Sequence, residues 1–126
     1  MDPVRQTSEP RRDLPVPLPV EVVGREGAAR IEYAVNVSAS GLCLHAPRPW
    51  AAGQSLRVAF TLPDGGGRIE AHARVAWSEA PARSARARFR ELGLRFETLR
   101  EEDRRRLARF AAGLPAELRP GGDGAR

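Results

Sequence analysis

The sequence has one cysteine, two histidines and no lysine, and only 6% of its 126 residues are aromatic. The single Cys43 excludes an internal disulfide, and no His or Cys set has the spacing of a metal site. No apolar run approaches the roughly 20 residues that cross a membrane. The first residues also lack the apolar core of a signal peptide. We therefore expect a soluble, cytoplasmic protein without membrane insertion and without a metal or other cofactor.

Arginine carries all of the positive side-chain charge. The 21 arginines outnumber 16 acidic residues, which gives a net charge of +5. Arginine can fork onto a guanine edge or a phosphate, where lysine presents only a point charge. The composition therefore permits a nucleotide or nucleic-acid partner without selecting one.

Nucleic acid is the less favoured of these partners. A basic strip beside the last predicted strand fits either a solvated surface or a nucleic-acid contact; its residues are Arg83, Arg86, Arg88 and Arg90. Barrels that bind nucleic acid usually add exposed aromatic side chains for base stacking. Here most aromatic residues are expected at core-facing positions: Tyr33, Phe60, Trp77, Phe89 and Phe96.

The length fits one domain, flanked by two segments that are rich in proline or glycine. Residues 1–17 hold four prolines and the arginines Arg5, Arg11 and Arg12, which predicts an extended, flexible arm. Residues 114–126 are expected to be a disordered tail. The ordered domain should therefore span residues 18–113.

Six short alternating segments predict an all-β domain. The predicted strands are 18–22, 31–37, 41–46, 56–62, 69–77 and 92–96, with a glycine turn at 24–27 and a hairpin turn at 64–67. In the second strand we expect Ile31, Tyr33, Val35 and Val37 to share the buried face. Six antiparallel strands with one apolar face each favour a closed or nearly closed barrel, which removes exposed edges.

One helix is predicted after the last strand. Thr98 and Glu101 fit a capping box at its start, and Gly113 before Pro115 fits its end. A narrow apolar stripe should pack over one opening or flank of the barrel; it consists of Leu107, Phe110, Ala111 and Leu114.

The sequence offers no catalytic constellation. His45 and His72 have no cysteine or carboxylate partner at a convincing spacing. The acidic residues at 101–103 are explained by the dipole at a helix N-terminus, and the glycines at 65–67 by a hairpin. We therefore expect that the protein is not an enzyme.

A polar box separates the second and third predicted strands. Residues 36–41 read Asn-x-Ser-x-x-Gly, with Asn36, Ser38 and Gly41 at the fixed positions. By itself such a corner fits a turn in which Asn and Ser bond their own backbone. It also fits a ligand site if another segment supplies a partner for it.

Together, the arginine-bearing arm, the six strands, the box and the terminal helix resemble the PilZ domain family of bacteria. The similarity covers roughly residues 10–113 and implies a six-stranded antiparallel β-barrel that serves as a receptor for cyclic di-GMP. By this resemblance Asn36 and Ser38 would bond a guanine edge and a nearby phosphate, and Gly41 would let the backbone turn beside the ligand. A protein effector, not identifiable from the sequence, would receive the signal.

The second motif of the family is Arg-Arg-x-x-Arg on the arm. Residues 11–15 match it at Arg11 and Arg12, but Pro15 replaces the last arginine. One guanidinium on a guanine edge contributes about 1–3 kcal/mol to discrimination. The resemblance therefore leaves two readings open: a dinucleotide receptor that uses Arg11 and Arg12, or a degenerate domain that binds only protein.

Overall fold

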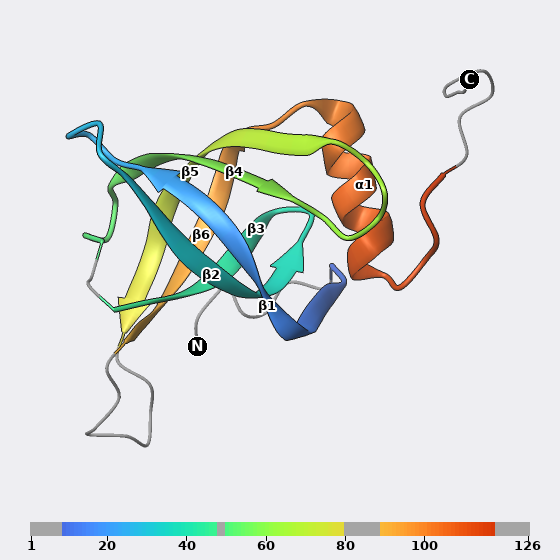
Figure 1. Ribbon diagram of the computed structural model, residues 1–126, viewed down its shortest axis with the longest axis horizontal. Helices are drawn as coiled ribbons and strands as arrows, with labels where there is room; N and C mark the ends of the chain where they lie inside the picture. The colour runs from blue at the N-terminus through green and yellow to red at the C-terminus, as the bar shows by residue number, and fades with distance from the viewer. Residues whose placement is uncertain (1–8, 48–49, 80–88, 118–126) are drawn as a thin grey trace.

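The chain folds into a closed six-stranded antiparallel barrel with one helix at its end (Figure 1), as the sequence predicted. The computed structural model describes residues 9–47, 50–79 and 89–117. The order of strands around the barrel is β1-β2-β3-β6-β5-β4. The elements are β1 (Arg11–Val23), β2 (Ala29–Ser38), β3 (Gly41–Ala46), β4 (Ser55–Thr61), β5 (Arg68–Glu79), β6 (Arg90–Thr98) and α1 (Glu101–Ala111).

Strand β1 closes the barrel because it pairs on both sides. Its residues 18–23 pair with β2, while residues 21–23 also pair with β4. Aliphatic side chains from all six strands fill the interior, among them the fully buried Val20, Leu44, Ile69 and Leu92. Both predicted turns are present: the amide of Gly27 donates to the carbonyl of Gly24, and the 64–67 hairpin joins β4 to β5.

The predicted boundary between arm and barrel is in the wrong place. Residues 11–13, expected in the flexible arm, pair with residues 36–38 of β2. The register shifts between Asp13 and Leu18, where two prolines lack the amide that a continuous ladder needs. The backbone of 11–17 is extended, as the prolines predicted, but β1 begins at Arg11 rather than at Leu18. Residues 1–8 of the predicted arm, with Arg5, lie outside the described ranges.

The buried face predicted for β2 is also wrong. Ile31 and Tyr33 are 52% and 49% exposed, whereas Glu32 and Ala34 face the interior. The pairing with β3 slips between Ala34 and Asn36, so a bulge at Val35 exchanges the two faces. Beyond the bulge the alternation continues with Val37 inside.

A polar pair allows Glu32 to face inward. Its carboxylate accepts a hydrogen bond of 2.8 Å from the indole Nε1 of Trp50 and lies 3.4 Å from the guanidinium of Arg30. The same guanidinium lies 3.8 Å from the centre of the Trp50 ring. This cluster gives the buried charge both a cationic and a hydrogen-bonding partner, which it needs in a low-dielectric site.

Helix α1 lies at one end of the barrel, beside the β4–β5 hairpin and the start of β1 (Figure 1). Leu107 and Phe110 join the core, as predicted, but Leu114 lies beyond the helix and is half exposed. The predicted capping box is wrong: Thr98 belongs to β6, and the N-cap is Arg100, with no side-chain cap bond. The first turn holds three acidic residues, which the helix dipole favours.

The C-terminus of α1 ends as the sequence predicted. Gly113 has a φ of +75°, and its amide donates to the carbonyl of Phe110, while the amide of Leu114 donates to the carbonyl of Arg109. These two bonds form a Schellman motif, which favours glycine at this position. Residues 114–117 of the predicted tail have no regular secondary structure, and residues 118–126 lie outside the described part.

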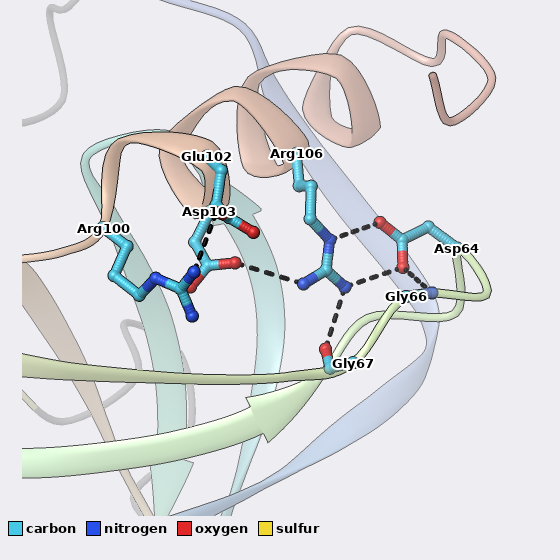
Figure 2. A network of polar contacts seen from close by, with 7 residues as sticks. All are labelled: Asp64, Gly66, Gly67, Arg100, Glu102, Asp103 and Arg106. Atoms are coloured by element: carbon cyan, nitrogen blue, oxygen red, sulfur yellow. Dashed lines mark hydrogen bonds and ion pairs between the residues drawn. The ribbon is translucent and has the colours of Figure 1, made fainter. Parts of the chain in front are cut away.

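A guanidinium fastens α1 to the β4–β5 hairpin (Figure 2). Arg106 donates two hydrogen bonds to the carboxylate of Asp64, at 2.9 and 3.1 Å, and one of 2.9 Å to the carbonyl of Gly67. It also donates to Asp103 at 3.2 Å. Gly66 leaves room for this side chain, since a Cβ there would overlap it. Partial burial alone would raise the pKa of Asp64, but hydrogen bonds from Arg106 and from the Gly66 amide keep that pKa below its usual value.

We expect Arg106→Leu to lower the free energy of unfolding by about 3 kcal/mol, because two shielded carboxylates would lose their shared cation. The side chains of Asp64 and Asp103 are only 9% and 5% exposed, respectively. Urea denaturation followed by circular dichroism measures the change. The control is Arg105→Leu, at an exposed position on the same helix, which should change stability by less than about 0.5 kcal/mol.

The effect of Arg106→Leu should also depend on pH. Because the folded-state pKa of Asp64 is lowered, its contribution is complete above the unfolded-state pKa and is lost as the pH falls through the folded-state value. The stability difference between wild type and variant should therefore shrink in acid. A difference that stays constant from neutral to acid pH would contradict this role of the ion pair.

Candidate functional site

The box at residues 36–41 spans the end of β2, the turn at residues 39–40 and the first residue of β3, and Ser38 organises it. The Ser38 hydroxyl accepts hydrogen bonds of 3.2 Å from the amides of Ser40 and Gly41. Ser38 is buried, with 6% exposure. The local interpretation of the box, in which Ser bonds its own backbone, therefore holds for this residue.

Gly41 is needed for space rather than for an unusual backbone angle. It is not among the glycines with positive φ. A Cβ at this position would overlap the backbone carbonyl oxygen of Leu94 on β6. Gly41 therefore allows β3 and β6 to approach closely at the turn.

Three other parts of the chain hold the turn: Glu9, helix α1 and strand β6. The Ser40 hydroxyl donates to the carboxylate of Glu9, and Arg104 of α1 donates to the carbonyl of Ala39 at 3.3 Å. The amide of Phe96 bonds the carbonyl of Ser40 at 2.8 Å. Sequence analysis missed Glu9 and Arg104, because nothing in the local pattern links either of them to the box.

Asn36 opens onto a cavity of about 410 Å³ on the outer face of the barrel. A row of residues paired across the strands runs through Asp13, Asn36, Cys43, Gly93 and Trp77, and all of these except Gly93 line the cavity. Arg11 lies two residues before Asp13 on β1 and also lines the cavity. Arg11 and Asn36 are therefore two of the five predicted site residues that the fold brings together.

Trp77 is a site residue that the sequence misplaced. It was expected in the core, but the register of β5 shifts between Val75 and Trp77, so that Trp77 lines the outer cavity. The indole lies over Gly93, where a Cβ would overlap it. A glycine in the interior of a strand often marks such a close approach, and Gly93 was the signal available in the sequence.

The cavity contains charges of both signs. Arg11 is the one arginine among the described residues that line it, whereas Asp13 and Glu91 are acidic. The imidazole Nε2 of His45 lies 3.3 Å from the Glu91 carboxylate, and its ring stacks on Phe89 with 4.3 Å between centroids. The described lining therefore offers hydrogen-bonding groups and aromatic surface, but no excess of positive charge.

Arg12 lies on the opposite face of β1. It pairs with the buried Val37, and its guanidinium lies 4.2 Å from the centre of the Phe110 ring. It also donates a hydrogen bond of 3.1 Å to the carbonyl of Phe110 on α1. Arg12, predicted to bind ligand, is therefore engaged by the helix, since neighbours along a strand point to opposite faces.

Among the described residues, Ser38, Gly41 and Arg90 do not line this cavity. Arg90 of the basic strip bonds the side chain and carbonyl of Ser78, at 3.0 and 3.2 Å. Arg83, Arg86 and Arg88 lie outside the described residues. Within the described ranges, no group of three or more His, Cys, Asp or Glu residues could hold a metal ion.

The helix that the described residues form is not long and apolar enough to cross a membrane.

The structure resembles three solved proteins at low sequence identity. The inhibitor of motility MotI/DgrA of Bacillus subtilis is 21% identical, with a TM-score of 0.70. The c-di-GMP-dependent transcription regulatory factor MrkH is 15% identical, with a TM-score of 0.68. The PilZ domain of YcgR from Escherichia coli, solved with c-di-GMP, is 15% identical, with a TM-score of 0.64. At these identities the likeness shows the fold.

The three structures differ in how much of them this chain matches. Each match covers 86% of this chain, together with 50% of the MotI/DgrA and MrkH chains and 91% of the YcgR domain. The chain thus spans about half the length of the first two. No curated protein matches the sequence closely enough to count as a relative. The family model described as PilZ domain matches residues 5–113, and the chain therefore belongs to the PilZ domain family.

Proposed function

We propose that this protein is a non-catalytic receptor that binds cyclic di-GMP in the cavity beside Asn36 and relays the signal to a protein partner. One observation carries the proposal: Arg11 of the arm and Asn36 of the box line the same cavity. Family membership supports it, as does the structure of the YcgR domain with c-di-GMP.

The groups in the cavity suit a guanine base. Arg11 can donate two parallel hydrogen bonds to the acceptor edge of guanine. The Asn36 amide can both donate and accept, and the carboxylates of Asp13 and Glu91 can accept from the N–H groups of the base. The indole of Trp77 offers a stacking surface, which contributes about 1–3 kcal/mol per base where aromatics bind single strands. Ser38 and Gly41 act indirectly in this proposal, by fixing the turn that positions Asn36.

The two phosphates of the ligand require more positive charge than Arg11 supplies, because Asp13 and Glu91 repel anions. Arg12 is the nearest candidate along the chain. To reach the cavity it must leave Phe110, which requires a change in residues 11–13. Only three residue pairs join this short segment to β2, and the register shift after Asp13 separates it from the rest of β1. The segment can therefore rearrange without opening the barrel, which gives the receptor an element to switch.

A second function is favoured by the charge balance of the cavity. Pro15 supplies neither charge nor donor where the family motif has its last arginine, and Arg12 is held on α1. A domain with these features can keep the fold and bind a protein partner without the dinucleotide. Such an adaptor would bind the same protein partner with or without cyclic di-GMP, and a pull-down would recover that partner in both cases.

Isothermal titration with cyclic di-GMP tests the receptor. We expect saturable binding with a dissociation constant in the micromolar range or below. Arg11→Ala should weaken binding about tenfold or more, since loss of a bidentate guanine contact costs roughly 1–3 kcal/mol. Arg105→Ala, at an exposed site on α1, should bind as wild type does. No heat at a millimolar excess of ligand over folded protein would favour the nucleotide-independent adaptor.

The contact between Arg12 and Phe110 gives a second prediction. If Arg12 moves to the ligand, Phe110→Leu should strengthen binding about two- to fivefold, because a cation–π contact at an exposed site contributes roughly 0.5–1 kcal/mol. Arg12→Ala should weaken binding in the same titration. The matched control is Leu107→Met, which changes the same apolar face of α1 without contacting Arg12. Unchanged affinity in both Phe110→Leu and Arg12→Ala would show that Arg12 stays on the helix.

A further inference from the structure

A second and larger cavity, of about 580 Å³, lies on the outer face of β1, β4 and β5. Thr98 at the end of β6 and the connection to α1, residues 99–100, form part of its wall. Among the residues that the structure describes, this cavity shares no lining residue with the one beside Asn36. The receptor function proposed above leaves it unused.

The register of the strands explains why the surface is hollow here. Ala59 on β4 faces outward between Glu21 of β1 and Glu70 of β5. Its short side chain lies among long ones and is only 8% exposed. Val23 and Leu99 line the same cavity. The result is a groove with an apolar floor, defined by Val23, Ala59 and Leu99, and a charged rim.

The charge on the rim is unequal. At one end Arg68 binds both carboxylates, Glu21 at 2.6 Å and Glu70 at 3.2 Å, so these acids are already partnered. At the other end Arg57 and His72 face each other across β4 and β5. No carboxylate among the described residues pairs with Arg57. Arg100 lies two residues beyond Thr98, the partner of His72 on β6, and lines the same groove; it bonds Glu102 at 2.8 Å and keeps further donors.

The shape of the groove decides the kind of occupant. Small-molecule sites enclose most of their ligand's surface. Here the rim is open, since the side chains of Arg68, Glu70 and Arg100 are 53%, 73% and 70% exposed. Because the barrel is closed, its sheet offers no edge for strand addition. A partner must therefore bind through side chains that lie on the apolar floor and meet the basic end.

We propose that this groove binds an acidic, aliphatic peptide segment of a protein partner. Aliphatic side chains of the segment pack on Ala59 and Leu99, and carboxylates of the segment pair with Arg57 at the basic end and with the unused donors of Arg100. The carboxylates of Glu21 and Glu70 are held by Arg68, so they do not repel the segment as strongly as unpaired acids would. The site needs no dinucleotide, so the proposal stands or falls independently of the receptor function.

Fluorescence anisotropy with a labelled peptide of alternating leucine and glutamate tests the proposal. We expect saturable binding by the full chain, with chemical shift changes at Val23, Ala59 and Leu99. A peptide of alternating leucine and arginine lacks the carboxylates, and one of alternating serine and glutamate lacks the apolar side chains. Each should bind at least about tenfold more weakly. Equal binding of all three peptides, or shift changes confined to the cavity beside Asn36, would overturn the proposal.

Variants separate the groove from the net charge of the protein. Ala59→Leu fills the apolar floor of the groove, and Arg57→Glu reverses the charge at its basic end. Each variant should weaken binding of the leucine–glutamate peptide at least about tenfold. Arg105→Glu makes the same charge change on an exposed position of α1 and should leave binding unchanged. An equal loss in Arg105→Glu would show general attraction to a basic protein. Full displacement of the peptide by free glutarate would show a small-anion site instead. Either result would overturn the proposal.

Discussion

The double pairing of β1 is the constraint on which the rest of the structure depends. Residues 18–23 bond β2 while residues 21–23 also bond β4, and this closes the barrel and removes its edges. The same strand extends past a register shift to set residues 11–13 beside the box. The same strand therefore both closes the barrel and places Arg11 at the cavity. Alternation along that strand also sends Arg12 to the other face, where Phe110 holds it.

Local departures from regular pairing decide which side chains face the cavity beside Asn36. The slip beside Val35 puts Asn36 on the outer face, and the slip between Val75 and Trp77 puts the indole over Gly93. The hollow around Ala59 has a different origin, because the pairing there is regular and the depression comes from one short side chain among long ones. Two arginines of α1 bond other parts of the molecule, Arg106 the hairpin and Arg104 the box, and the N-cap residue Arg100 lines the second cavity.

Much of the fold was predictable from local patterns. Alternation of apolar residues gave the number and order of the strands, and glycine with proline gave the turns and the end of α1, because each of these depends on neighbours in sequence. The face of Tyr33, the face of Trp77 and the start of β1 were not predictable in the same way. A single bulge exchanges the two faces of a strand, and its position is set by the partner strand rather than by the strand's own residues.

For the candidate site, the sequence by itself determined that Asn36, Ser38 and Gly41 form a polar corner and that Arg11 and Arg12 are adjacent on the proline-rich N-terminal segment, because these are facts of spacing. Tertiary structure decided their roles. In the folded chain Arg11 and Asn36 line one cavity, and Arg12 contacts α1 instead. Ser38 stabilises the turn, and Gly41 allows the close contact with β6. The physical reason is that burial, register and close approach depend on strands distant in the chain, and a linear motif contains none of that information.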